Sequence, residues 1–221
     1  KITVTGRKSG TANITATTAR GDVTAVCKVT VKKMDAPGSF RTASAAYNQI
    51  KVSWSGVSGA GGYEVFYSTS KEGSYTKKAT LKSSARSYTF TGLTTGKTYY
   101  FKVRGYKVES DNTRYAGEYT AVKSAKPTLS KQSSFKVKAG KKSFTASWKK
   151  VSGASGYTVY YSTNKTSGFK SKTVKGNSKV KYTVKSLKKG KTYYVKSRAY
   201  RTVSGKKVYG PYTSLVRVKA K

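Results

Sequence analysis

The sequence predicts an all-β chain of tandem β-sandwiches that follow one another in an extended rod. Apolar and polar residues alternate in short runs rich in Val, Thr and Tyr, separated by Gly- and Ser-rich turns. One eleven-residue stretch occurs twice, as GKTYYFKVRGY at 96–106 and as GKTYYVKSRAY at 190–200. Short linkers with one Pro each, at 34–37 and 124–128, predict little freedom between modules.

The first 33 residues read as short strands. ITVTG at 2–6, ANITATT at 12–18 and VTAVCKVTV at 23–31 alternate, with a turn expected at 19–22. In the last run Cys27 shares a face with Val29 and Val31, which predicts a small buried side chain. A single cysteine cannot form an intrachain disulfide, so it says nothing about the redox compartment.

The pattern GTANITATT…GDVTAVCKVTV resembles the C-terminal half of a bacterial Ig-like group 2 domain. About 33 residues carry too little core to fold alone. The resemblance therefore implies a partial Ig-like domain over residues 1–33. Its missing strands are expected upstream, in the neighbouring module or in another chain.

Residues 34–126 and 127–221 are a tandem repeat with an offset of 94, which falls to 93 at Tyr119 and Tyr212. The change of offset places a length difference in the loop at 107–118 and 201–211, as expected between strands. The pairs at offset 94 include Trp54 and Trp148, Tyr63 and Tyr157, Tyr67 and Tyr161, Tyr88 and Tyr182, and Leu93 and Leu187.

Each repeat contains about seven strand-like runs. Ile50, Val52 and Trp54 alternate toward one face, as do Phe144, Ala146 and Trp148 in the second repeat. Seven short strands around one buried Trp predict an Ig-like β-sandwich. The runs of the first repeat lie near 38–43, 49–55, 62–68, 75–80, 86–91, 98–107 and 115–123.

Residues 34–221 resemble two fibronectin type III domains, in the form common in secreted proteins of Gram-positive bacteria. The resemblance rests on the two Trp, on Tyr-x-Val-x-Tyr at 63–67 and 157–161, and on Leu-x-x-Gly-x-Thr-Tyr at 93–99 and 187–193. It implies that Tyr99 and Tyr193 form the tyrosine corner, with a hydroxyl that bonds back to the backbone. It also implies a non-catalytic module.

The charge is extreme and uneven. The chain has 46 Lys and Arg against 7 Asp and Glu, a formal net charge of +39. Residues 34–126 carry 14 basic and 6 acidic side chains, whereas residues 127–221 carry 25 basic and none acidic. Such a surface attracts polyanions. No sequence-specific nucleic-acid motif is present, and no apolar run approaches the ~20 residues that would insert into a membrane.

Signals for catalysis are nearly absent. The chain has no His, which excludes a His-dependent triad and a His metal ligand. We expect no catalytic residue, cofactor or metal. Glu109, Asp111 and Glu118 near a loop read as solvated charges, with a weak Ca²⁺ site as the alternative. Arg20, Gly21 and Asp22 spell an integrin motif, but at a predicted hairpin tip a turn is the simpler interpretation.

The repeated stretch supplies the candidate site. On its outward face, aromatic and cationic side chains alternate beside an aromatic residue of the preceding Tyr-x-Val-x-Tyr run. Two interpretations stay open: a polyanion or glycan face, or cross-strand pairs that cover the sheet. The candidate residues are Tyr160, Tyr194, Lys196, Arg198 and Tyr200, and in the first repeat Phe66, Tyr100, Lys102, Arg104 and Tyr106.

These observations predict a non-catalytic spacer or adhesion module, extracellular, on a bacterial cell surface or secreted. Its second domain would contact anionic cell-wall or host polymers. Two alternatives stay open: a fibre subunit that assembles by strand addition through residues 1–33, and an accessory region of a secreted carbohydrate-active or wall-lytic enzyme.

Overall fold

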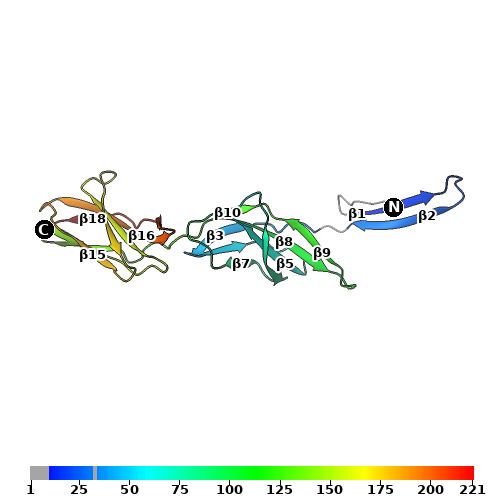
Figure 1. Ribbon diagram of the computed structural model, residues 1–221, viewed down its shortest axis with the longest axis horizontal. Coiled ribbons are helices and arrows are strands. Elements are labelled where there is room, and N and C mark those ends of the chain that lie inside the picture. Colours follow the sequence, from blue (N-terminus) through cyan, green and yellow to red (C-terminus); the bar gives the residue numbers. More distant parts are fainter. Residues whose placement is uncertain (1–9, 32–33) are drawn as a thin grey trace. The chain divides into compact units, whose positions relative to one another are not determined.

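The computed structural model describes residues 10–31 and 34–221 (Figure 1). In this part of the chain every regular element is a strand, and no helix that could cross a membrane is found. The predicted strand at 2–6 lies outside the described residues. The all-β prediction is therefore confirmed for the chain as described.

The N-terminal element is a hairpin of β1 (Gly10–Thr17) and β2 (Thr24–Val31), which pair antiparallel with Ile14 opposite Cys27. Residues directly opposite share a face, so Ile14, Cys27 and Val29 lie together on an apolar side. Cys27 is nevertheless exposed, and the prediction that it is buried is wrong. Alternation places a side chain on a face, but burial needs a second layer, which two strands alone do not supply.

The first repeat forms two sheets. In one, β4 (Gln49–Ser53) lies between β3 (Arg41–Ala46) and β7 (Ser87–Phe90). In the other the order is β10 (Lys123–Ala125), β8 (Tyr99–Val108), β5 (Gly62–Ser68) and β6 (Thr76–Lys82), and β9 (Arg114–Tyr119) also pairs with β8. Five of the seven predicted runs fall on β4 to β8.

Two predicted strands of the first repeat differ from the structure. The run at 38–43 begins too early: Ser39 has a φ of 49°, which no strand residue adopts, and β3 begins at Arg41. The run at 115–123 is two strands, β9 and β10. Between them Thr120 bonds twice to Val103, with its amide as donor at 2.8 Å and its hydroxyl as acceptor at 3.1 Å.

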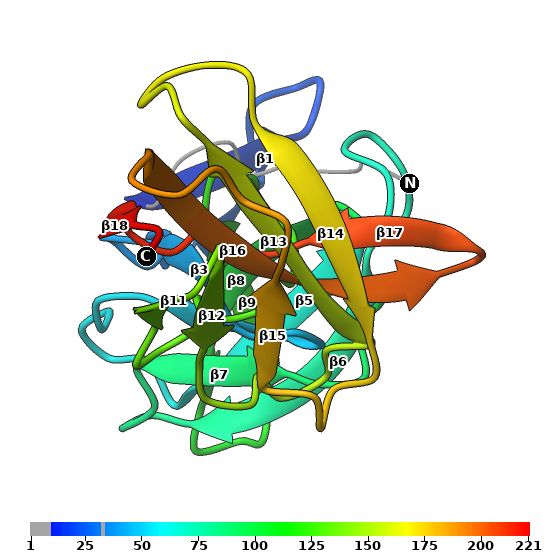
Figure 2. The ribbon, with the colours of Figure 1, turned by 90° about the vertical axis from the view of Figure 1, so that its left-hand side faces the viewer.

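The second repeat also forms two sheets. One orders β11 (Lys136–Gly140), β12 (Ser143–Ser147) and β15 (Lys181–Val184). The other orders β14 (Lys170–Lys175), β13 (Gly156–Ser162), β16 (Thr192–Val203) and β17 (Lys206–Tyr209), and β18 (Val216–Lys219) pairs with the start of β16 (Figure 2).

The core of the second repeat lies between its two sheets, because residues of both belong to one buried cluster. Phe144, Ala146 and Trp148 are exposed by at most 5%, which confirms the predicted inward face. From the other sheet, Val159 and Val195 are fully buried. The corresponding residues of the first repeat, Ile50, Val52 and Trp54, are equally buried.

Both tyrosine corners are present. The Tyr99 hydroxyl accepts a hydrogen bond from the Thr94 amide at 3.0 Å, and the Tyr193 hydroxyl accepts one from the Lys188 amide at 3.1 Å. Both rings are buried, so each hydroxyl is satisfied by backbone of the preceding turn. The bond back to the backbone that the resemblance implied is confirmed.

Candidate polyanion-binding face

The outer side of the five-stranded sheet of the second repeat carries the candidate residues. On β16, Lys196 and Arg198 alternate with buried Val195, Ser197 and Ala199, so their side chains leave the core side. Beside them β13 presents Tyr160, which pairs with Lys196 in the register. We call Tyr160, Lys196, Arg198, Tyr209 and Tyr212 the aromatic–cationic face.

Arg198 is the centre of this face. Its Nε and Nη2 atoms donate to the Tyr160 hydroxyl at 3.1 and 2.9 Å. Its guanidinium carbon lies 3.8 Å from the ring centroid of Tyr209 and 4.4 Å from that of Tyr212. Lys196 is held in the same way, with its Nζ atom 4.5 Å from the Tyr212 centroid and 4.3 Å from that of Phe169. The cations are therefore positioned by rings.

Two residues predicted to face water are buried instead. Tyr200 is 4% exposed and Phe66 is 7% exposed. Tyr200 pairs with Gly156, and a Cβ at that glycine would lie 2.6 Å from the Tyr200 hydroxyl oxygen, so the missing side chain makes room for the ring. Phe66 is covered by Arg104, at 5.3 Å, and by Tyr119, at 5.2 Å. Tyr200 is likewise packed against Tyr209, at 6.1 Å between ring centroids.

Tyr194 and Tyr100 lie at the ends of the two faces. In the register Tyr194 is opposite Ser162 on one side and Arg217 on the other. Tyr100 is opposite Ser68. Both side chains are half-buried. Tyr194 and Tyr100 therefore lie on the same side of their sheets as the cations, two residues along the strand from Lys196 and Lys102.

The first repeat builds the same arrangement. Lys102 lies 3.9 Å from the Tyr119 centroid and 4.4 Å from that of Tyr75, and Arg104 lies 4.8 Å from that of Tyr119. Near the end of the sheet, Arg114 lies 4.0 Å from the Tyr106 centroid. Cation and aromatic side chains therefore interleave in both repeats, as the cross-strand interpretation requires.

The two faces differ at one buried position. Glu64, on β5, is 2% exposed and accepts bonds from three cations: Arg104 Nε at 2.8 Å, Arg114 Nη2 at 2.8 Å and Lys77 Nζ at 3.0 Å. Burial by itself would raise the pKa of Glu64. The bonds from Lys77 and Arg104 and the charges of Arg104 and Arg114 outweigh it and hold this pKa below its usual range. The face of the first repeat thus contains its own counter-charge.

Thr158 occupies the equivalent position in the second repeat. It pairs with Arg198 as Glu64 pairs with Arg104, and it is also 2% exposed. Its hydroxyl oxygen is buried, and within the described residues it has no hydrogen-bond partner. Since residues 127–221 include no Asp or Glu, the second repeat cannot supply a carboxylate to Arg198 from its own sequence.

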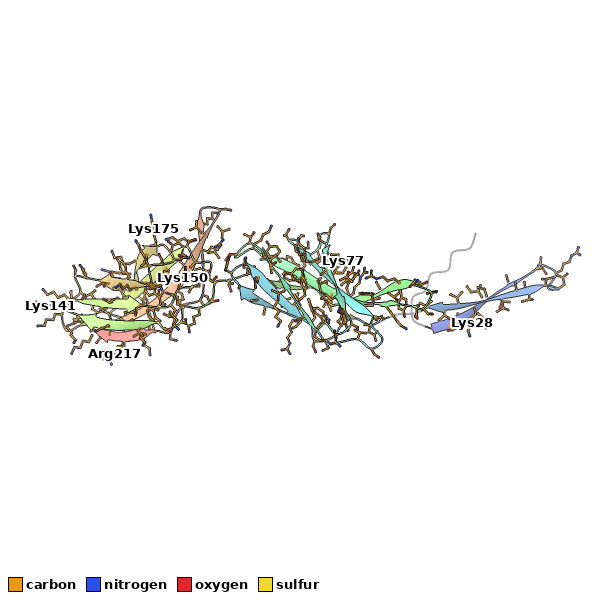
Figure 3. The ribbon with its side chains drawn as sticks, turned by 90° about the horizontal axis from the view of Figure 1, so that it is seen from below. Lys28, Lys77, Lys141, Lys150, Lys175 and Arg217 are labelled. Carbon is orange, nitrogen blue, oxygen red and sulfur yellow. The ribbon has the colours of Figure 1, made fainter. Side chains whose placement is uncertain are left out.

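Cations cover the rest of the second repeat. Figure 3 labels Lys141, Lys150, Lys175 and Arg217, which come from different strands and loops and are all exposed. A cleft of about 420 Å³ near the start of β16 adds four more. Its lining includes Lys170, Lys185, Lys188 and Lys191 together with Tyr161 and Tyr193.

The other sequence candidates have local partners. Asp22 accepts a hydrogen bond from the Thr18 hydroxyl at 2.5 Å, which lowers the pKa of Asp22 and closes the hairpin tip around Gly21, at φ 76°. These contacts account for the turn, and integrin recognition stays a prediction. Among the loop acids, Glu109 accepts from the Tyr115 hydroxyl at 3.0 Å and Asp111 from the Thr113 amide at 2.9 Å.

Comparisons with known proteins agree with this architecture. The model of the fibronectin type III domain matches residues 35–120 and 126–213. The chain belongs to the fibronectin type III family. Domains of this family are generally non-catalytic and typical of extracellular proteins, so the chain is consistent with a spacer or adhesion module.

A solved structure shows the same fold as this chain. A two fibronectin type-III domain segment from chicken tenascin is 16% identical, with a TM-score of 0.53, over 84% of this chain and 100% of that segment. The FN1–FN3 domains of chicken CNTN1 are 16% identical, with a TM-score of 0.39, over 96% of this chain and 77% of that one. No curated protein matches the chain.

Proposed function

We propose that the chain is a non-catalytic spacer and adhesion module of a bacterial secreted or surface protein, and that its second fibronectin type III domain contacts anionic polymers of a cell wall or host. One observation carries the proposal: residues 127–221 hold 25 basic side chains and no acidic one. A solvated surface of ordinary composition mixes both signs. This domain has no acidic side chain of its own to balance its cations.

The geometry supports the proposal in two ways. Rings hold Lys196 and Arg198 over the sheet, so these cations lose less side-chain freedom when an anion binds. The lysine-lined cleft offers a concave surface in the same domain. In the first domain, by contrast, Glu64 already forms ion pairs with three cations. Anionic polymers are therefore expected to prefer the second domain.

The test is binding of the full chain to a panel of anionic and neutral polysaccharides at several salt concentrations. Four lysines of the cleft (Lys170, Lys185, Lys188 and Lys191) are changed to Gln. The matched control changes four exposed lysines of the first domain to Gln: Lys51, Lys78, Lys82 and Lys123. Both variants lose the same net charge.

The cleft variant should weaken binding to anionic polymers and flatten its salt dependence, whereas the control should keep most of the affinity. Equal losses in the two variants would show that only the total charge matters. If the wild-type chain fails to bind at physiological salt, where charges are screened over ~8 Å, the domain is a spacer with a solvated cationic surface.

The hairpin carries a second candidate function, which is strand addition through residues 1–33. The observation in its favour is the apolar side of β1 and β2, which stays largely exposed. Sedimentation of the full chain tests it: I14D with V29D should abolish self-association, whereas T15D with T30D, on the opposite side, should not. A monomeric wild-type chain would refute assembly through this hairpin.

A further inference from the structure

The exchange of Glu64 for Thr158 leaves a carboxylate position that the second domain does not fill. Both residues lie on the outer side of the central strand, and both pair with an arginine on one neighbour and a threonine on the other. In the first domain that threonine is Thr80, and in the second it is Thr173. The backbone frame around the position is therefore the same in both domains.

Two of the three cations that hold Glu64 have counterparts in the second domain. Arg198 stands at the position of Arg104, and Lys207 stands at that of Arg114, at the offset of 93 that applies in this strand. Lys207 lies 4.7 Å from the Tyr200 centroid, as Arg114 lies over Tyr106. It also donates to the Thr173 hydroxyl at 3.2 Å, next to Thr158.

At this position the second domain has a polar side chain that lacks a hydrogen bond within the described residues. The Thr158 hydroxyl is buried without a hydrogen-bond partner among the described residues, whereas the carboxylate at the same place in the first domain has three. A buried hydroxyl without a partner costs free energy unless a ligand or water supplies the bond. Arg198 offers five N–H donors, and its two bonds to Tyr160 leave it able to donate to an anion as well.

We propose that Arg198 and Lys207, at the position where Thr158 replaces Glu64, bind a carboxylate group of an acidic saccharide, that is, a uronic acid residue. A carboxylate is the group that the equivalent cations bind in the first domain. The saccharide is indicated by the ring beside the position: Tyr212 is 37% exposed, so a pyranose ring attached to the carboxylate has aromatic surface to stack on.

This inference rests on the proposed function but is more specific, because it assigns one anion to one position rather than to the whole cationic surface. The lysine-lined cleft and the exposed cations would attract any polyanion. The position at Thr158 is specific, because the first domain has its own carboxylate there, Glu64, and the second domain does not. A substitution at this position therefore separates the two ideas.

The test is titration of the full chain with an oligogalacturonate, with oligoglutamate and with a neutral oligosaccharide of equal length. T158E places a carboxylate where the first domain has one, and should weaken oligogalacturonate binding by about tenfold, the effect of one lost charge-assisted contact. S178E makes the same change of net charge in an exposed turn of this domain and should alter affinity about twofold at most, by screened charge alone.

The reverse change, E64T, gives the first domain the arrangement of the second, and should raise the stoichiometry from one to two galacturonate sites per chain. A cooperative melting transition of T158E would show that the variant is folded. Equal effects of T158E and S178E would overturn the assigned position even if the chain binds polyanions. Binding of oligoglutamate as tight as that of oligogalacturonate would overturn the saccharide. A wild-type chain that binds none of the probes would overturn the proposed function as well.

Discussion

Glu64 offers a direct test of how the first domain neutralises its cations. In E64Q the side chain keeps its shape and burial but loses its charge. Each of the three charged hydrogen bonds would contribute up to about 1.5–3 kcal/mol if both partners were buried. The cations, however, are 48%, 27% and 42% exposed and recover water when the carboxylate is removed. We therefore expect E64Q to destabilise the first domain by about 2 kcal/mol.

For a domain of this size, that loss corresponds to a fall in the melting temperature of roughly 10 °C. Differential scanning calorimetry of the full chain should show it as a shift of one transition, with the transition of the second domain unchanged. The control is E72Q, because Glu72 is 85% exposed and pairs with Lys71, itself 67% exposed, at 3.5 Å. A surface pair of this kind contributes at most ~1 kcal/mol.

The pH dependence gives a second readout. Because the pKa of Glu64 is held below its usual value of 4.5, the carboxylate stabilises the folded domain above that pH, and the stabilisation is lost as the pH falls through the lowered pKa. The difference between wild type and E64Q should therefore be full at neutral pH and shrink in acid. Equal shifts for E64Q and E72Q at neutral pH, or a difference that persists in strong acid, would refute this account of Glu64.

Three further predictions concern single side chains. Y99F and Y193F should each cost about 1 kcal/mol in urea unfolding, the net contribution of one hydrogen bond, with Y100F as the neutral control. G156A should destabilise the second domain by about 2–3 kcal/mol in the same assay, because the added Cβ would overlap the Val174 carbonyl oxygen, whereas G38A, whose Cβ would make only an ordinary contact of 3.9 Å with the Ser55 Cβ, should not. Cys27 should react with a thiol reagent in the native chain, and protection until unfolding would show that the hairpin is covered.

The alternation of single strands predicted most of the fold. It placed Ile50, Phe144 and both Trp residues in the core, and the two tyrosine corners followed from the resemblance. It failed where burial depends on what lies above a strand. Cys27 is exposed because its face has no second layer in the described hairpin. Tyr200 is buried because Tyr209, opposite it in the register, packs against its ring at 6.1 Å between centroids.

The site was predicted only in part for a similar reason. Tyr160, Lys196 and Arg198 share a face through strand period alone, but Tyr209 and Tyr212 reach Arg198 from another part of the chain. Glu64 gave no local signal, since its three cations come from β6, β8 and β9. A comparison of the repeats position by position, which aligns Glu64 with Thr158, would have identified the difference.

The exchange at this position also links the folding of the second domain to its surroundings. A domain without acidic side chains is destabilised by its own charge, so any polyanion that binds the folded form shifts the folding equilibrium by mass action. Its melting temperature would then report how much anionic polymer is nearby, whereas that of the first domain would not. Two copies of one fold, joined in one chain, would thus differ in whether their stability is an intrinsic property or one set by the medium.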